Sequence, residues 1–245
     1  MNAVIRALFE RKSVRAFTQE AITEEEKELI LESAFQAPTA GNQMLYTILD
    51  IQDQKIKEAL AEVCDHQPFI ARAPLVLVFL ADCRRWMDAY EAAGAPHREP
   101  SAGDLLLACE DALVAAQNSV TAAQSLGIGS CYIGDILENR EEVVRLLNLD
   151  EAVLPIALVV YGHPDEGQVK RPKPARFSRE YIVLKDQYRR LDEKEIREMF
   201  QKRSGQKDFD FDSYVRAFCE RKYMSGFALE MNRSAAAYIE EFLKK

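Results

Sequence analysis

One long segment, residues 103–126, is rich in Ala and Leu and limits the architectures open to this chain. Its apolar residues fall on more than one helical face, whereas a surface helix has a single apolar stripe. Such a helix needs apolar neighbours around most of its circumference. The segment therefore predicts a long helix that lies either at the centre of a folded domain or in an interface between subunits.

Helix and strand patterns alternate on both sides of that segment. Apolar spacing predicts helices over residues 2–11, 24–36, 53–63 and 140–147. Thr23 and Glu26 form a capping-box pattern at the start of the second of these helices. Short apolar runs predict strands over residues 46–51, 75–80, 130–133 and 154–161. The polar segment 84–101 contains Gly94, Pro96 and Pro100, so its second half is expected to be a surface loop.

A basic linker containing two prolines, residues 170–176, precedes a helical tail. Amphipathic patterns predict tail helices over residues 192–203, 211–222 and 234–244. Short helices of this kind are not stable alone and must dock on something, and a partner subunit is the favoured surface. The expected division is a main domain over residues 1–188 and a helical C-terminal extension over residues 189–245.

The charge balance excludes some classes of partner. The chain has 32 Lys and Arg against 40 Asp and Glu, a formal net charge of −8 at pH 7. This is the wrong sign for coating nucleic acid or an anionic membrane. No run approaches the roughly 20 apolar residues that cross a bilayer, and the N-terminus lacks the order of a signal peptide. We expect a cytoplasmic protein without nucleic-acid or membrane partners.

Known catalytic and metal-binding patterns are missing from the sequence. The 5 Cys contain no CxxC pair and the 3 His are scattered, so no structural zinc is expected. The cysteines are expected to be buried small apolar residues or incidental thiols. Dinucleotide-binding, P-loop, nucleophile-elbow and zinc-protease motifs are also missing. If the protein is an enzyme, a bound cofactor should carry the chemistry.

Four clusters remain as candidate ligand sites. Arg11, Lys12, Ser13 and Arg15 are either an anion grip or a solvated basic turn. The loop 37–43 either lets a backbone approach a ligand or simply connects a helix to a strand, and the second interpretation is favoured from the loop alone. The glycine-flanked strand at residues 127–135 offers main-chain N–H groups to a planar heterocycle. The linker, with Arg171 and Lys173, either completes a phosphate site or is solvated.

In this order, the segments resemble the FMN-dependent nitroreductase and flavin reductase family, above all its NADPH-type oxygen-insensitive nitroreductases. The similarity lies in Glu10-Arg11-Lys12-Ser13-Val14-Arg15-Ala16-Phe17, Ala37-Pro38-Thr39-Ala40-Gly41-Asn42-Gln43, Tyr132-Ile133-Gly134, and Gly162-His163-Pro164 with the linker. It covers roughly residues 1–188 and leaves the tail outside. It implies an α+β fold, with a mixed, mainly antiparallel sheet of four or five strands surrounded by helices. It also implies an intertwined homodimer with two FMN sites at the subunit interface.

The resemblance also implies which residues hold FMN. Arg11, Lys12, Ser13 and Arg15 would hold the phosphate and flavin edge, joined by Arg171 and Lys173, with Lys170 and Arg176 as alternative phosphate partners. Gln67 would hydrogen-bond the flavin ring, and the backbone at Tyr132, Ile133 and Gly134 would lie near its N5 atom. The partner subunit would supply the loop residues Pro38, Thr39 and Asn42.

The implied function is that of an FMN-dependent NAD(P)H oxidoreductase. Hydride would pass from NADPH or NADH to the flavin N5 atom, and then in a second, ping-pong step to nitroaromatics, quinones, flavins or similar small planar oxidants. The cycle would need no catalytic side chain and no metal. The alternative is a flavin-binding or sensing protein of the same fold without significant turnover.

Overall fold

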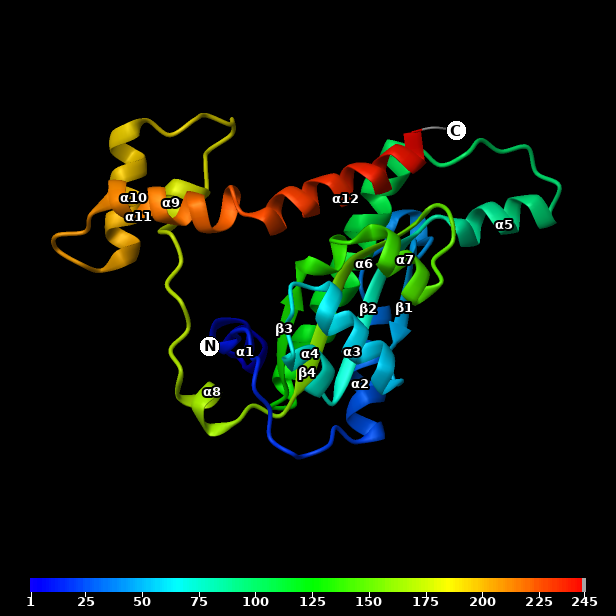
Figure 1. Cartoon of the computed structure of the whole chain (residues 1–245), viewed down its shortest axis with the longest axis horizontal. Helices are drawn as coiled ribbons and strands as arrows, with labels where there is room; N and C mark the ends of the chain where they lie inside the picture. The colour runs from blue at the N-terminus through cyan, green and yellow to red at the C-terminus, as the bar shows by residue number, and fades with distance from the viewer. Residues whose placement is uncertain (244–245) are drawn as a thin grey trace. The chain divides into compact units, whose positions relative to one another are not determined.

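The computed structural model describes residues 1–243, and its centre is one four-stranded antiparallel sheet. The strands are β1 (Tyr46–Asp50), β2 (Leu75–Asp82), β3 (Gly129–Ile133) and β4 (Val153–Gly162), in the order β1-β2-β4-β3 (Figure 1). Tyr46 pairs with Ala81, Leu75 with Tyr161, and Gly129 with Gly162. β1 and β3 are therefore the two edges of the sheet, and the expected mainly antiparallel sheet is confirmed.

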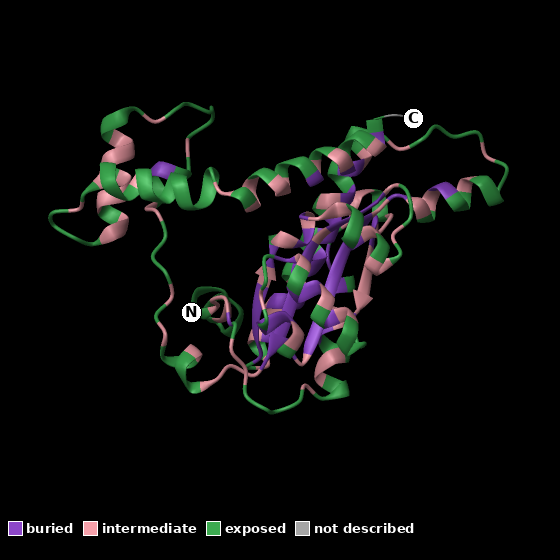
Figure 2. Ribbon diagram, in the orientation of Figure 1, coloured by how far each residue is buried: buried purple, intermediate pink, exposed green. Residues whose placement is uncertain are grey.

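The long helix expected over residues 103–126 is α6 (Ala102–Ser125), and it covers one face of the sheet with α2 (Glu24–Phe35). Its inner positions are small, with Ala112, Ala115 and Ala116 fully buried, so the helix packs closely on the strands (Figure 2). Its other side leaves apolar residues exposed, among them Leu106, Leu107 and Leu113. The expected capping box of Thr23 and Glu26 begins α2.

The opposite face of the sheet is covered by α3 (Gln54–Val63), α4 (Phe69–Arg72) and α7 (Arg140–Leu147). Alternate residues of β2 divide between the two layers, Val76 and Val78 facing these helices and Leu77 and Phe79 facing α6. All of these residues are fully buried. The near-continuous apolar run of β2 is thus explained by helices on both faces.

Three further helices belong to this layered part. They are α1 (Ala3–Glu10), α5 (Arg84–Ala92) and α8 (Glu166–Lys170). The first half of the segment 84–101 is helical, and its second half carries no helix or strand, as expected. In the described part of the chain, no helix combines the length and apolar character needed to cross a membrane.

Contacts divide the chain into two compact units, of which the first combines residues 1–171 with the described residues from Glu230 onward. The second comprises residues 172–229, with α9 (Arg179–Ile182), α10 (Glu193–Ser204), α11 (Phe211–Phe218) and a π-helical turn (Cys219–Tyr223). Its interior is aromatic: the centre of the Phe200 ring lies 5.1 Å from that of Phe177 and 5.4 Å from that of Phe211. The expected division between residues 188 and 189 does not coincide with these units.

The last helix explains the difference. α12 (Gly226–Leu243) begins eight residues before the predicted start at residue 234, because Ser225 accepts from the N–H of Ala228 and Leu229. Its second half packs on the first unit, where Tyr238 and Phe242 are buried beside Leu45 and Leu154. The predicted tail is therefore two structures, an aromatic unit and the end of a helix that completes the core of the first unit.

Candidate functional site

The basic segment at residues 11–18 is attached to one edge of the sheet through its main chain. Ser13 forms a parallel bridge with Ser130 of β3, and the N–H of Val14 donates to the Ser130 carbonyl at 2.9 Å. Phe17 forms a bridge with Pro164, and the N–H of Thr18 donates to the His163 carbonyl at 2.9 Å. The segment is therefore held along β3 and the end of β4, which explains why the Gly162-His163-Pro164 motif accompanies it.

Two glycines allow this close approach. A Cβ atom on Gly129 would lie 2.6 Å from the Val14 side chain, and one on Gly162 would lie 2.6 Å from the Phe17 ring. Both separations are shorter than side-chain atoms tolerate. Gly129, the first residue of β3, and Gly162, the last residue of β4, are thus needed for the packing of the basic segment.

The positive side chains of the segment are spread over its neighbours. The Arg11 guanidinium lies 5.8 Å from the centre of the Tyr132 ring, and that of Arg15 lies 6.0 Å from the Phe69 ring. Burial raises the pKa of Tyr132 to about 12, against the opposing effect of Arg11. The pKa of the Cys131 thiol is likewise raised by burial, although Arg15 and Ser13 lower it.

Lys12 and Arg171 tie the linker to the basic segment. The Lys12 ammonium donates to the carbonyl of Val169 at 2.8 Å and to the carbonyl of Arg171, and the Arg171 guanidinium donates to the carbonyl of Ser13. Lys170 instead pairs with Glu166, and both side chains are largely exposed. Lys173 and Arg176 belong to the second unit. Of the four alternative linker cations, Arg171 is the one joined to the segment within the first unit.

Two donors of this cluster fit an anionic group. The Nε atoms of Arg11 and Arg171 are buried, and residues 1–243 supply neither with a hydrogen-bond acceptor. A buried charged donor without an acceptor is costly, so such atoms are expected to meet a ligand or solvent. A phosphate carries about −1.5 to −2 charge and three acceptor oxygens, which matches a site with several cations and the Ser13 hydroxyl. The residues present therefore fit the phosphate of FMN.

Gln67 is brought to the same region from the other side of β3. Its Nε2 atom donates to the Cys64 carbonyl and to Oδ2 of Asp135, each at 2.8 Å. Asp135 follows Tyr132-Ile133-Gly134 directly, in the short helix η2 (Gly134–Leu137). Ile133 is buried in the core, so only its backbone is available to a ligand. A cavity of about 520 Å³ lies alongside, lined by Arg15, Phe69 and Arg72 among others.

The loop at residues 38–45 accepts hydrogen bonds from Arg85 and Trp86 of α5 and is also held by one buried carboxylate on α6. Asp111, 5% exposed, accepts from the Thr39 hydroxyl, from the N–H of Ala40 at 2.9 Å and from the N–H of Leu45 at 3.1 Å. Between Ala40 and Leu45 the backbone is left-handed at three residues, Gly41, Asn42 and Met44, with φ of 57°, 58° and 52°. This leaves Pro38 and Asn42 exposed and Thr39 half-buried.

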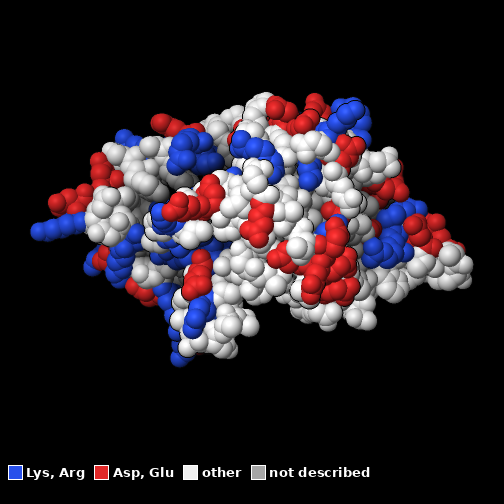
Figure 3. All heavy atoms as spheres, turned by 90° about the horizontal axis from the view of Figure 1, so that it is seen from below, with Lys and Arg blue, Asp and Glu red and all other residues white. Residues whose placement is uncertain are grey.

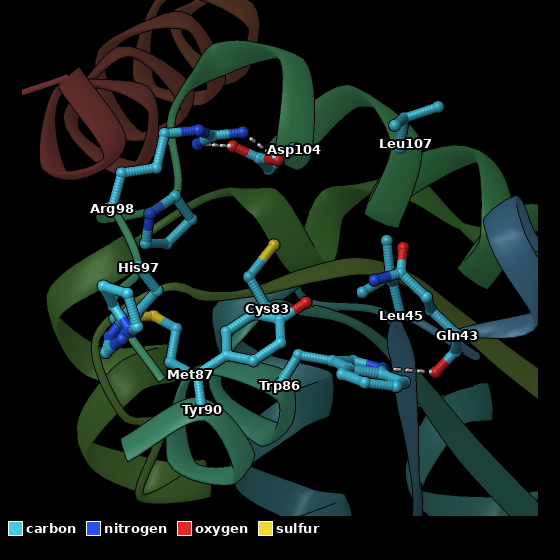
Figure 4. A pocket seen from close by; sticks show the side chains of 12 residues that line it. Gln43, Leu45, Cys83, Trp86, Met87, Tyr90, His97, Arg98, Asp104 and Leu107 are labelled. Atoms are coloured by element: carbon cyan, nitrogen blue, oxygen red, sulfur yellow. Dashed lines mark hydrogen bonds and ion pairs between the residues drawn. The ribbon is translucent and has the colours of Figure 1, made fainter. Parts of the chain in front are cut away.

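The loop also borders a second cavity, of about 380 Å³, between α5 and α6 (Figure 4). The Trp86 indole N–H donates to the Gln43 carbonyl at 2.8 Å, and the Trp86 and Tyr90 rings lie 5.8 Å apart on the α5 side. The Cys83 thiol, with its pKa raised by burial to about 12, points into the cavity. At its rim Arg98 and Asp104 neutralise each other in an ion pair.

The predicted site residues therefore form two groups within one subunit. Arg11, Lys12, Ser13, Arg15, Gln67, Tyr132, Ile133, Gly134 and Arg171 gather at the β3 edge. Pro38, Thr39 and Asn42 precede β1, at the other edge and the other end of the sheet (Figure 1). Neighbouring strands are about 4.8 Å apart, so three such spacings, about 14 Å in all, separate the two edge strands.

Three acidic residues of the site went unpredicted. Asp111 holds the loop, Asp135 holds Gln67, and Glu138 lies buried beside Asp135. An Asp among the Ala and Leu residues of the segment 103–126 was an available signal for the first, and an Asp directly after Tyr132-Ile133-Gly134 for the second. On the face drawn in Figure 3, acidic and basic side chains are interspersed, so the basic segment is a local feature of an acidic protein.

Comparisons with known proteins show which family the chain resembles. The profile of the Nitroreductase family matches residues 8–163. A Bacillus subtilis protein named FMN reductase [NAD(P)H] is 30% identical over 91% of this chain and 93% of its own. The oxygen-insensitive NADPH nitroreductase of Salmonella typhimurium is 34% identical over 79% of this chain and 78% of its own.

A solved structure extends the likeness to nearly the whole chain. B. megaterium NfrA2 has a TM-score of 0.78 and 29% identity, covering 96% of this chain and 98% of its own. The expectation that the likeness ends near residue 188 was therefore wrong. The helices after that residue share the fold of these relatives, although their sequence alone carries no recognisable motif.

Proposed function

The chain belongs to the nitroreductase family, and on that basis we propose that it is an FMN-dependent NAD(P)H oxidoreductase acting on small planar oxidants such as nitroaromatics, quinones or flavins. The observation that carries this proposal is the cluster at the β3 edge. There, the buried Nε atoms of Arg11 and Arg171 lack hydrogen-bond acceptors, and Ser13 and the backbone of β3 lie beside them. The phosphate of FMN would supply the acceptors, and its planar ring would lie against the β3 backbone.

The proposed roles follow from these positions. Arg11, Ser13, Arg15 and Arg171 bind the FMN phosphate and flavin edge, while Lys12 mainly holds the linker against the segment. Gln67 and the backbone at residues 132–134 face the ring. Bound FMN supplies the hydride acceptor that the side chains lack. The protein's own work is to orient the ring, hold its phosphate and leave a cleft for planar substrates.

We further propose that the functional unit is a homodimer with FMN at the subunit interface. Within one subunit the loop 38–42 and the basic cluster lie at opposite edges of the sheet, so a second copy must supply the loop. Apolar side chains are exposed on α1 and on the outer side of α6, among them Val4, Ile5, Leu106 and Leu113. Apolar surface of this extent favours burial between subunits.

The deciding experiment is the absorption spectrum of the purified protein with FMN, before and after anaerobic addition of NADPH and then NADH. Flavin bands that either nucleotide bleaches, and that an added quinone restores, are the expected result. Bands that neither nucleotide bleaches would favour the flavin-binding or sensing alternative. A protein that cannot be loaded with FMN would overturn the proposal.

The phosphate grip has its own test. Arg11→Ala and Arg15→Ala are each expected to raise the dissociation constant for FMN by about 10- to 100-fold, because charge-assisted hydrogen bonds contribute roughly 1.5–3 kcal/mol each. Arg6→Ala, on the exposed side of α1, is the matched control. Equal FMN affinity in all three variants would refute the grip.

A further inference from the structure

The orientation of the Gln67 carboxamide is dictated by its neighbours. Nε2 is 2.8 Å from the Cys64 carbonyl oxygen and 2.8 Å from Oδ2 of Asp135. A carbonyl and a carboxylate can only accept hydrogen bonds, so the NH2 group must face them and both of its hydrogens are used. The remaining polar atom, Oε1, takes no part in these two bonds and can only accept a hydrogen bond.

Asp135 has a second carboxyl group as a neighbour. Glu138 lies one helical turn further on: its N–H donates to the Asp135 carbonyl at 3.0 Å, and the residue is 4% exposed. Oε1 of Glu138 is buried and has no hydrogen-bond partner among residues 1–243. A buried carboxyl oxygen without a donor, next to a second carboxyl group, favours one proton held by the two groups over two negative charges.

The surroundings of Glu138 oppose its ionisation. Burial is the main cause, and the charges of Asp135, Asp65 and Glu230 act in the same direction, so that the pKa of Glu138 rises to about 8. Glu230, on α12, is itself kept ionised by Arg233, which lowers its pKa to about 2. The nearby Cys64 thiol has its pKa raised by burial and stays neutral.

We propose that Asp135 and Glu138 form a positioning pair for Gln67, in which one shared proton keeps Asp135 an acceptor and keeps Oε1 of Gln67 turned to the flavin. This inference rests on the proposed function, because it takes the flavin ring as the group that Gln67 faces. When the pH is high enough to remove the shared proton, the charge of the pair changes from −1 to −2. A second negative charge behind Gln67 disfavours the electron-rich reduced flavin, so the flavin's midpoint potential falls.

The test compares the midpoint potential and absorption spectrum of FMN-loaded protein between pH 6 and pH 9. The variants are Glu138→Gln, Asp135→Asn and the exposed control Glu142→Gln. Wild type and Glu142→Gln should show an additional fall in potential near pH 8, with a matching spectral step, and Glu138→Gln should lack both. Asp135→Asn should raise the dissociation constant for FMN by about tenfold, since a charge-assisted bond to Gln67 is lost.

Each outcome decides between two statements. Identical pH profiles in wild type and Glu138→Gln, with FMN bound and bleached by NAD(P)H, would overturn the positioning pair and leave the proposed function standing. Failure of the wild type to bind FMN would overturn both. If Asp135→Asn does not fold, the Glu138→Gln comparison decides alone, because a neutral amide of nearly the same shape replaces a protonated acid.

Discussion

The basic segment at residues 11–18 and the loop at residues 38–45 lie at opposite edges of one sheet, and they are held in different ways. The segment is anchored by main-chain bridges to Ser130 and Pro164 and by close packing over two glycines. The loop has left-handed backbone angles at three positions and is held by side chains, with three hydrogen bonds to the Asp111 carboxylate and one from the Trp86 indole.

The difference bears on how the proposed cofactor site would be assembled. A segment that contributes charged side chains needs a backbone fixed along its length, which pairing to the sheet provides. A loop whose outer residues stay exposed must keep its shape without burying them, and hydrogen bonds from the buried side, chiefly to Asp111, achieve this. Substitutions that separate the two kinds of anchor can test the comparison.

The largest effect is expected from Asp111→Ala. It leaves the N–H groups of Ala40 and Leu45 and the Thr39 hydroxyl without their acceptor, so the free energy of unfolding should fall by roughly 2–4 kcal/mol. Urea denaturation of the variant measures this, with Glu110→Gln as the exposed control on the same helix. A loss no greater than that of the control would mean that the loop holds its shape without Asp111.

Gly162→Ala changes the close packing that holds the basic segment at residues 11–18. The new Cβ atom would meet the Phe17 ring at 2.6 Å and Pro74 at 2.9 Å, so the segment must shift and stability should fall by about 1–3 kcal/mol. FMN affinity should fall as well, because Ser13 and Arg15 move with the segment. Gly103→Ala is the control, since nothing lies within 4 Å of its Cβ position. Unchanged FMN affinity in Gly162→Ala would break the link between this packing and the phosphate grip.

Glu138, which lies close after β3, should make the stability of the protein depend on pH. Burial raises the pKa of Glu138 from an ordinary 4.5 to about 8, so the folded state binds more protons than the unfolded chain between these values. Stability from this group is therefore complete below pH 4.5 and is lost as pH rises to 8. Between pH 5 and pH 8.5, wild type should lose roughly 1–3 kcal/mol more than Glu138→Gln in urea titrations. Parallel curves for the two proteins would show that Glu138 ionises normally.

The smallest effect is expected from Lys170→Ala. Its exposed pair with Glu166 contributes little, and the FMN dissociation constant should change less than about twofold. Arg171→Ala, one residue further on, should weaken FMN binding by about tenfold or more, because its guanidinium adjoins Ser13. Fluorescence titration with FMN compares the two. The reverse order would make Lys170 the phosphate partner.

Much of the local structure could be predicted because it depends on neighbours in sequence. The helix expected over residues 103–126 spans Ala102–Ser125, and the capping box at Thr23 forms as its residue pattern indicates. The predicted start of α12 was wrong by eight residues, because the helix begins at Gly226, where the Ser225 hydroxyl accepts from the N–H of Ala228. The roles of the FMN-binding residues stay predictions.

The acidic residues of the site could not be predicted in the same way. Asp111 meets Thr39 across 72 residues, and Asp135 meets Gln67 across 68. A carboxylate in a sequence is normally a solvated surface group, and it becomes an anchor only when folding buries it against main-chain donors. Glu138 acquired its raised pKa through the same burial.

By itself, the sequence determined the four strands, most of the longer helices, the basic segment and its likeness to the nitroreductase family, because periodicity, capping and motif spacing are local properties. Only the tertiary structure decided that the two groups of predicted site residues lie at opposite edges of the sheet. That separation depends on the strand order β1-β2-β4-β3, and strand order is set by which apolar faces pack together over long distances in the chain.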